Sequence, residues 1–325
     1  MAYVAGIDIG GTKCAVTIGS VSEEGVAVAD KIRMETPATP QEAVPALVEA
    51  LKELTKRHPD KPIAAVGVSC GGPLDSKKGL ILSPPNLKSW DRIDICTPFE
   101  QEFGVPCALQ NDANACGLAE WLWGAGKGTE NMIFLTFGTG MGAGLILNGR
   151  LYAGTNDMAG EAGHMRLEAD GPEGYYKKGS FEGFCSGGGI ARLAKIMLGE
   201  YLAENKTTKV LKLQPDPSKI TARDLGIAAN EGDEFARKVY ETVGEKLGKG
   251  LAVLIDILNP EKIVIGSIFL RQEQLLRPAM EKAIRREALS DAAQVCEIVP
   301  AGLKEEIGDY AALSVGYHHL LRSVE

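Results

Sequence analysis

The sequence contains no basic run, although it has 325 residues. Its formal net charge is −8, and 43 acidic side chains outnumber 35 basic ones. Proteins that bind nucleic acid need a basic patch that neutralises phosphates. The composition therefore argues against a nucleic-acid partner. Any phosphate that binds here has to be held locally, by backbone amides and a few lysines.

Long apolar runs are missing as well. No stretch approaches the roughly 18 apolar residues of a transmembrane helix, and the longest run, 251–258, is interrupted by Asp256. The first ten residues lack the basic region and the apolar core of a signal peptide. We therefore expect a cytoplasmic protein without a membrane partner.

Cysteine pairs of the C-x-x-C type are also absent. The seven cysteines are scattered along the chain, at Cys14, Cys70, Cys96, Cys107, Cys116, Cys185 and Cys296. An odd number without regular spacing does not indicate a disulfide framework or a cysteine-rich metal site. We expect reduced thiols in the core, as is usual in the cytoplasm.

Glycine is abundant, with 39 residues. Near the start, an alternating strand over 2–9 is followed by Gly10 and Gly11 and by a returning strand over 14–20. The pattern repeats later, with a strand over 132–137, a glycine-rich turn and a returning strand over 145–152. Each hairpin begins a run of alternating helices and strands. The sequence therefore predicts an α/β protein with an internal duplication.

The remaining elements complete this pattern. Thr39 and Glu42 predict a capping box for a helix that ends near His58. A long helix is expected from the N-cap Asp233 to Leu258. Further strands are expected over 63–69, 105–109, 263–266 and 295–299, a helix after 110–114, helices from 190 onward, and a closing helix from about 309.

Glycine-rich turns of this kind occur in three phosphate-binding architectures. The Walker A loop requires lysine before threonine, but here Thr12 precedes Lys13. The letters at 138–143 match a dinucleotide fingerprint, which must open a helix, whereas 145–152 reads as a strand. The third architecture is a pair of β-hairpins from two related domains that hold one nucleotide. The duplication favours this third architecture.

In the paired-hairpin architecture, exposed backbone amides form two anion nests. The first consists of Gly10, Gly11, Thr12 and Lys13, and the second of Gly138, Thr139, Gly140 and Gly142. Asp8, at the end of the first strand, would hold hydrated Mg²⁺. The alternative for either hairpin alone is an ordinary glycine turn.

Five segments together resemble the ROK family of repressors and sugar kinases, within the actin and hexokinase superfamily. They are GIDIGGTK, QNDANACGLAE, LTFGTGMGAGLILNGRLYAG, AGEAGHM and NPEKIVIG, in the family's order over residues 4 to about 315. The resemblance implies a two-domain actin-like or hexokinase-type (ribonuclease H-like) α/β fold. It implies a small domain over 1–118, joined by a C-terminal helix over 305–325, and a large domain over 119–304.

The resemblance also implies an activity. It indicates an ATP- and Mg²⁺-dependent kinase that phosphorylates the 6-hydroxyl of a hexose, with glucose as the default sugar, and that forms a homodimer. Gly266 and Ser267 match positions close to the adenine, although the family often has glycine where Ser267 stands. Phosphoryl transfer to a hydroxyl requires positioning, charge neutralisation and a carboxylate that accepts the proton.

Asp112 is the candidate for that carboxylate. It lies between an expected strand and an expected helix, so its local alternative is an N-cap aspartate. The two roles are compatible, because the positive end of the helix would keep the carboxyl ionised. The resemblance implies that Asp112 is the catalytic base.

Sugar binding requires many directional hydrogen bonds, and several polar residues fit this need. Taken alone, His164 is as well explained by a structural imidazole, and Glu182 by a surface carboxylate. The resemblance implies sugar contacts for both. The expected set is Asn86, Asn111, Asp112, Glu161, His164 and Glu182, with a backbone approach at Gly71 and Gly72.

One segment departs from the family. The resemblance implies a zinc loop with three cysteines, but Glu173, Tyr175 and Ser180 stand at those positions. Zinc prefers about four sulfur or imidazole ligands, and His164, Glu173 and the distant Cys185 are a poor set. We expect no structural zinc, and a loop ordered by packing of Tyr175, Tyr176 and Phe181.

Other functions remain open at this level. The family's repressors carry a winged helix-turn-helix before the first hairpin, and here that hairpin starts within a few residues of Met1. A non-catalytic sugar sensor on the same fold is an alternative, as is a kinase for an N-acetylhexosamine such as N-acetylmannosamine. The sequence does not fix the sugar.

Overall fold

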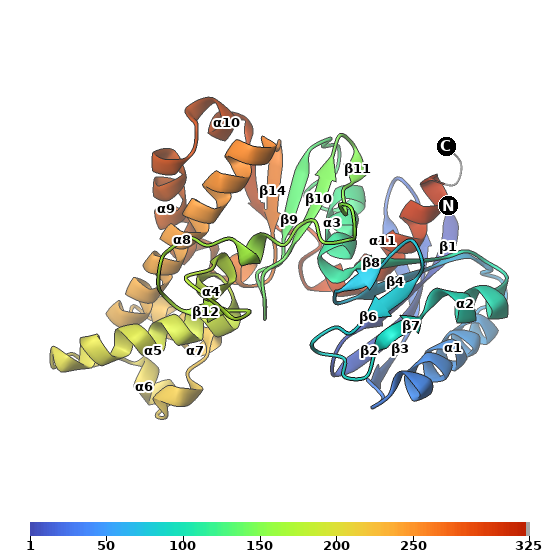
Figure 1. Cartoon of the computed structure of the whole chain (residues 1–325), viewed down its shortest axis with the longest axis horizontal. Helices are drawn as coiled ribbons and strands as arrows, with labels where there is room; N and C mark the ends of the chain where they lie inside the picture. The colour runs from blue at the N-terminus through green and yellow to red at the C-terminus, as the bar shows by residue number, and fades with distance from the viewer. Residues whose placement is uncertain (323–325) are drawn as a thin grey trace. The chain divides into compact units, whose positions relative to one another are not determined.

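The computed structural model describes residues 1–322, which form two compact units. Unit 1 contains 1–134, 144–160 and the C-terminal segment from Gly302, and unit 2 contains Leu135–Ala143 and Glu161–Ala301. Figure 1 shows the chain coloured from one end to the other. The domain boundaries expected at 118 and 304 stay a prediction.

The sheet of unit 1 has five strands in the order β3-β2-β1-β4-β8. Its strands are β1 (Ala2–Ile9), β2 (Lys13–Val21), β3 (Val26–Glu35), β4 (Ile63–Cys70) and β8 (Cys107–Asn111). The first three form an antiparallel meander, whereas β1, β4 and β8 run parallel. Parallel strands end at the same edge of a sheet, so the segments that follow β1, β4 and β8 lie close together.

Helices cover both faces of this sheet (Figure 1). On one face, α1 (Pro40–Arg57) and α2 (Cys96–Phe103) bury Leu47, Leu51 and Phe99. On the other, α11 (Ile307–Arg322) lies against β1, β4 and α3 (Asp112–Trp123). A side chain on Gly67 would collide with the backbone of α11, so this glycine permits the close approach.

A buried glutamate ties the end of α3 to the C-terminal segment of unit 1. Glu120 is 0% exposed, and its carboxylate accepts hydrogen bonds from three backbone amides. The donors are Ala125 N at 2.8 Å, Gly302 N at 3.0 Å and Leu303 N at 2.9 Å. Glu120 therefore anchors the segment that leads into α11.

The second sheet repeats the topology of the first, as the duplication predicts. Its order is β11-β10-β9-β14-β15, which is again third, second, first, fourth and fifth along the chain. The strands are β9 (Met132–Leu135), β10 (Ala143–Leu147), β11 (Arg150–Leu151), β14 (Lys262–Ile265) and β15 (Glu297–Pro300). The last two are parallel.

Unit 2 is rich in helices, including α5 (Gly187–Ala203), α7 (Ala222–Asn230), α8 (Glu234–Leu258) and α9 (Ile268–Glu287). The predicted N-cap Asp233 is confirmed, because its carboxylate accepts from Ala236 N at 2.8 Å. Close packing of α8 on α9 depends on glycines: a Cβ at Gly248 would stand 2.7 Å from Ala283 Cβ.

Shorter elements fill the connections. These are β5 (Leu74–Asp75), β6 (Leu80–Leu82), β7 (Asp91–Asp94), β12 (Glu173–Gly174), β13 (Lys177–Lys178), α4 (Phe181–Phe184), α6 (Val210–Leu213), α10 (Ser290–Val295), η1 (Ala162–His164), η2 (Pro217–Lys219) and η3 (Lys304–Glu306).

Several local predictions need correction. The predicted capping box at Thr39 is wrong, because the Thr39 side chain makes no cap hydrogen bond. The backbone carbonyl of Thr39 accepts from Glu42 N and Ala43 N instead. The strand expected over 105–109 is β8, two residues further on. β3 was not predicted and carries exposed charged residues. The expectation of helices from 190 onward gave no bounds for α9, which contains Pro278 and a kink at Gln272.

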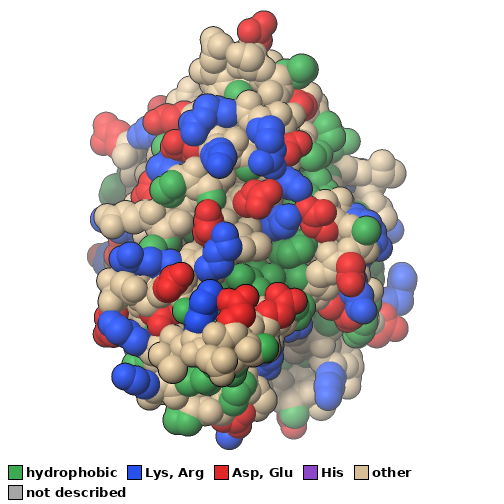
Figure 2. All heavy atoms as spheres, turned by 90° about the vertical axis from the view of Figure 1, so that its left-hand side faces the viewer, with side chains coloured by type: hydrophobic (Ala, Val, Ile, Leu, Met, Phe, Trp, Pro, Cys, Tyr) green, Lys and Arg blue, Asp and Glu red, His purple; other side chains and the backbone are tan. Residues whose placement is uncertain are grey.

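The surface of unit 2 mixes charges of both signs. Figure 2 shows acidic and basic side chains interspersed on one face, with apolar side chains between them. Within residues 1–322, no helix is both long and apolar enough to span a bilayer.

Candidate functional site

The tip of the first hairpin exposes its backbone at the carboxyl end of β1. Ile9 pairs with Cys14, and Gly10 N donates to Lys13 O at 3.0 Å. A Cβ on Gly11 would stand 2.8 Å from Asn86 O, so glycine is required here and Asn86 lies beside the tip. Gly11, Thr12 and Lys13 are exposed. The tip therefore lies at the surface, where an anion can reach it.

The ends of β4 and β8 bring further predicted residues to the same edge. Asp8 on β1 lies in register with Ser69 on β4, and Ser69 with Gln110 on β8. Gly71 and Gly72 follow β4, and a Cβ on Gly72 would stand 3.2 Å from Asn111 Nδ2. Unit 1 thus gathers its predicted site residues: Asp8, Gly10, Gly11, Thr12, Lys13, Gly71, Gly72, Asn86, Asn111 and Asp112.

Asp112 is the first residue of α3, not its N-cap. The N-cap is Asn111, whose Oδ1 accepts from Ala113 N at 2.9 Å, while Asp112 Oδ1 accepts from the same amide at 2.8 Å. Solvent reaches Asp112, yet it sits deep among protein atoms. This desolvation raises the pKa of the carboxyl above its usual range, and the Ala113 amide opposes the rise only in part.

The helix terminus was expected to favour the ionised form of the Asp112 carboxyl. Its backbone hydrogen bonds do lower the pKa, but loss of hydration has the larger effect. A carboxylate with a raised pKa is a stronger proton acceptor as long as it remains ionised at the working pH. The environment therefore suits a general base.

Asp8 is a second carboxyl group with a raised pKa, about 6. Burial is the largest cause, the charge of Asp112 adds to it, and Lys31 opposes it. Two neighbouring carboxylates with too little compensating charge fit a divalent cation. Mg²⁺ commonly binds through one or two carboxylates and keeps several waters, so Asp8 suits the expected water-mediated site.

We expect Asp8→Asn to stabilise the metal-free protein at pH 7.5 by about 1 kcal/mol, a value reduced for the partial solvation of the group. The folded pKa of Asp8, about 6, exceeds the unfolded value of 3.8, so the native state binds more protons between these values. Stability therefore falls as the pH rises through this window. The gain should be present above pH 6 and vanish below about pH 4.

Thermal unfolding in EDTA from pH 4 to pH 8 measures this effect, with Asp60→Asn, at an exposed position, as the control. An Asp8→Asn advantage that does not change with pH would contradict the assigned cause.

The second hairpin, formed by β9 and β10, has a comparable tip, and this tip belongs to unit 2. Gly138 N donates to Gly140 O at 3.2 Å, and Gly187 N at the start of α5 donates to Gly138 O at 2.8 Å. Thr139 is exposed at the tip. The loop is thus held against the amino terminus of a long helix, where backbone amides favour an anion.

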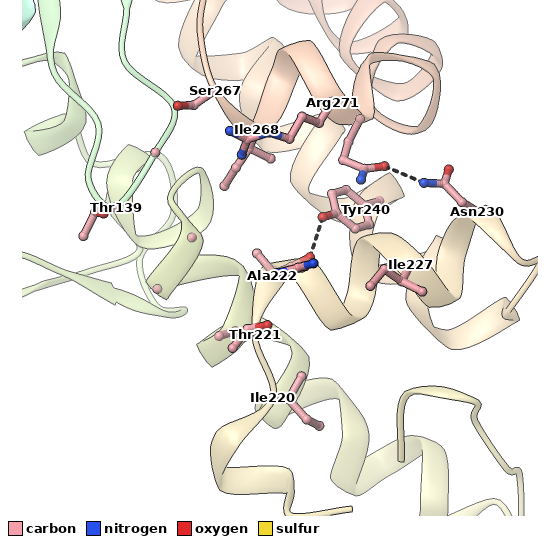
Figure 3. A pocket seen from close by; sticks show the side chains of 16 residues that line it. Thr139, Ile220, Thr221, Ala222, Ile227, Asn230, Tyr240, Ser267, Ile268 and Arg271 are labelled. Atoms are coloured by element: carbon pink, nitrogen blue, oxygen red, sulfur yellow. Dashed lines mark hydrogen bonds between the residues drawn. The ribbon is translucent and has the colours of Figure 1, made fainter. Parts of the chain in front are cut away.

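A cavity of about 970 Å³ opens beside this tip, entirely within unit 2. Figure 3 shows Thr139 at one end and Ile227 and Asn230 at the other. Ile227 contributes an apolar side chain at the end away from Thr139, and Ile220 and Ile268 add to the apolar lining, while Gly138, Thr139, Gly187 and Gly188 present backbone to the cavity. The cavity therefore suits a ligand with an anionic end and a flat apolar end.

Ser267 lines this cavity in a conformation that usually requires glycine. Its φ is 49° and its ψ is −105°, and Phe269 N donates to Gly266 O at 3.3 Å, which closes a turn of type II′. The turn is fixed from both sides, because Gly266 N donates to Leu135 O and Ile268 N to Phe137 O. The surrounding backbone thus imposes a strained conformation on the serine.

Glu182 and Gly163, the residue before His164, lie against the second hairpin. Met141 N donates to Glu182 Oε2 at 3.1 Å. A Cβ on Gly163 would meet Met141 O and would stand 3.2 Å from Glu182 Cβ. Unit 2 thus gathers its predicted residues, Gly138, Thr139, Gly140, Glu161, His164, Glu182, Gly266 and Ser267. Sequence reasoning missed Gly187, Gly188 and the isoleucines, although three glycines after Ser186 are a visible signal.

The altered loop is ordered differently from the prediction. Phe181 is fully buried, as expected, but Tyr175 and Tyr176 are 61% and 89% exposed and do not pack into the loop. Backbone hydrogen bonds order it instead, among them Leu167 N to Gly179 O at 2.9 Å and Phe181 N to Met165 O at 2.8 Å. In the described chain, no three His, Cys, Asp or Glu side chains gather as a metal site.

Comparison with known proteins places these features in a family. The sequence matches the ROK family over residues 4–315. The glucokinase of Streptomyces coelicolor is 30% identical over 312 residues, which are 95% of either protein. The xylose repressor of Bacillus subtilis is 24% identical over 323 residues, 98% of this chain and 78% of the repressor.

Solved structures share the fold. The crystal structure of a ROK family glucokinase from Streptomyces griseus, in complex with glucose and AMPPNP, superposes with a TM-score of 0.77 at 28% identity. The match covers 98% of this chain and all of the Streptomyces griseus chain. The architecture is therefore the two-domain α/β fold of ROK glucokinases, as predicted, and the chain belongs to the ROK family.

Proposed function

We propose that this protein is an ATP-dependent hexose kinase that phosphorylates the 6-hydroxyl of its sugar, with glucose as the first candidate. The observation that carries this proposal is the edge of the unit 1 sheet. There, Asp112 with its raised pKa lies near Asp8, and Asp8 lies on the strand that leads into the exposed hairpin tip. The glucokinase relatives support the same reaction.

Each residue has a defined part in this proposal. Asp112 Oδ accepts the proton of the attacking sugar hydroxyl. Backbone amides at Thr12 and Thr139 hold phosphate oxygens. The apolar end of the unit 2 cavity holds the base of the nucleotide. Mg²⁺, through waters on Asp8, would neutralise charge on the phosphates.

The residues assigned to the sugar are polar. Asn86, Asn111, Glu161, His164 and Glu182 carry the donors and acceptors that sugar hydroxyls require. Carboxylates and imidazoles of this kind serve glucose and N-acetylhexosamines alike. The altered 170–182 loop carries Glu182. Because this loop departs from the family pattern, a kinase for N-acetylmannosamine is the alternative. A homodimer and a cytoplasmic location also stay proposals.

A non-catalytic sugar sensor is the second candidate, and the replaced zinc loop and the xylose repressor among the relatives favour it. Against it stand Asp112 and Asp8, whose environment suits proton transfer and Mg²⁺. A sensor transfers no proton and no phosphoryl group, so it would not need a raised pKa at Asp112 or at Asp8.

A coupled assay of ADP release distinguishes the candidates. We expect turnover of ATP with glucose at roughly 1–100 s⁻¹, and little ATP hydrolysis without sugar. The panel should include mannose, fructose, allose, N-acetylglucosamine and N-acetylmannosamine. Should sugars raise the melting temperature while none of them is phosphorylated, the sensor would replace the kinase.

A further inference from the structure

The strands β12 and β13 form a short hairpin whose turn consists of two tyrosines. Glu173 pairs with Lys178 and Gly174 with Lys177, which leaves Tyr175 and Tyr176 as the central residues. Their φ angles are 41° and 62°. Positive φ at both central positions is the type I′ pattern, which strongly favours Asn-Gly. Two aromatic residues are therefore an unfavourable choice for this turn.

The two tyrosine side chains are not buried in a way that would offset the backbone strain of the turn. Both tyrosine side chains are largely exposed, at 61% and 89%. The Tyr175 ring instead contacts His164, with ring centroids 6.2 Å apart and planes at 73°, which is an edge-to-face arrangement. Tyr176 contacts only the Tyr175 ring, at 5.4 Å, among the ring contacts of residues 1–322.

A lysine of the hairpin also binds the backbone of His164. Lys177 Nζ donates a hydrogen bond to His164 O at 2.7 Å. At the base of the hairpin, a Cβ on Gly174 would stand 2.9 Å from the carbonyl carbon of Glu182, so this strand packs directly on the segment that carries Glu182. One small hairpin therefore connects His164 and Glu182, two of the three residues of unit 2 that are proposed to bind the sugar.

We propose that Tyr175 is a positioning residue that sets the orientation of the His164 imidazole for sugar binding. Strain is retained where the surrounding structure or a function requires it. Here the residue with the strained backbone is 61% exposed, and its ring contacts the His164 imidazole and the Tyr176 ring. The inference rests on the proposed sugar kinase, and it makes the Tyr175 ring a determinant of sugar affinity that does not touch the sugar.

Three variants test the proposal by kinetics. Tyr175→Gly relieves the backbone strain and removes the ring, so the melting temperature should not fall, whereas the KM for the sugar should rise roughly fivefold or more with the KM for ATP unchanged. Tyr175→Phe keeps the edge-to-face contact and should stay within about twofold of the parent protein. Tyr176→Gly is the matched control, because it relieves the same strain without removing the ring at His164.

Histidine NMR supplies a readout that needs no activity. The chain has four histidines, so the imidazole C–H signal of His164 can be assigned with His164→Gln. Loss of the Tyr175 ring should move this signal in Tyr175→Gly and leave it in place in Tyr176→Gly, because ring-current shifts depend on the neighbouring ring.

The outcomes separate this inference from the proposed function. If the parent protein phosphorylates no sugar, the kinase proposal fails, and the His164 signal still tests the contact. If the parent is active, the inference is overturned by an unchanged sugar KM in Tyr175→Gly, by equal losses in Tyr175→Gly and Tyr176→Gly, or by a loss in Tyr175→Phe. A large fall in the melting temperature of Tyr175→Gly also overturns it, since Tyr175 would then hold the loop rather than the imidazole.

Discussion

Replacing Asp112 by asparagine should lower the turnover of the sugar kinase by about 10²–10⁴-fold while the protein folds normally. The amide keeps the shape of the carboxylate and can still accept from Ala113 N, but it cannot take the proton of the sugar hydroxyl. Because desolvation raises the pKa of Asp112, removing its charge should leave the melting temperature equal or higher. The coupled ADP assay and a thermal melt measure both effects.

Asp60→Asn, a conservative change at an exposed position of unit 1, is the control for this experiment. The KM of Asp112→Asn for ATP should change little, since the group is assigned to proton transfer. An Asp112→Asn protein with turnover near that of the parent would remove Asp112 from the mechanism. A variant that has lost its fold would show instead that Asp112 is structural.

Truncation of Glu120 to alanine should lower the free energy of unfolding of unit 1 by about 3–5 kcal/mol. The carboxylate is fully buried and accepts from the amides of Ala125, Gly302 and Leu303. Without it, these three donors lose their partner inside the protein, and a cavity remains. Urea denaturation, followed by tryptophan fluorescence, measures the loss.

Glu53→Ala on α1 is the control, because the Glu53 pair with Arg57 lies on the surface and contributes little. Glu120→Gln should fall between the two, since its amide nitrogen cannot accept. Equal urea midpoints for Glu120→Ala and Glu53→Ala would contradict the prediction. They would show that water replaces the Glu120 carboxylate without loss of stability.

The features that could be predicted from the sequence were those with a local cause. The two hairpins could be predicted from alternating apolar residues on either side of Gly10, Gly11 and Gly138. The N-cap Asp233 could be predicted because apolar residues at helical spacing follow it. Asp112 could be selected because a strand and a helix meet there. The structure confirms the fold class and the duplication, whereas the catalytic roles stay proposals.

What could not be predicted depends on long-range contacts. β3 pairs with β2 despite its charged, exposed residues, so its strand character comes from the partner rather than from its own pattern. The sequence does not show that Ser267 has a positive φ, because hydrogen bonds to the distant segment that contains Leu135 and Phe137 hold the turn. The three backbone donors of Glu120 come from segments up to 183 residues away, which no local pattern reveals.

The chain order of the two units has a consequence for synthesis on the ribosome. Unit 2 is complete once residue 301 has left the exit tunnel, but the sheet of unit 1 still lacks α11, which follows unit 2 in the chain. The face of β1 and β4 that α11 covers stays open until this helix has emerged as well. Unit 2 should therefore complete its fold before unit 1, although domains near the amino terminus usually fold first. A stalled chain that ends before residue 302 should present that apolar face to chaperones.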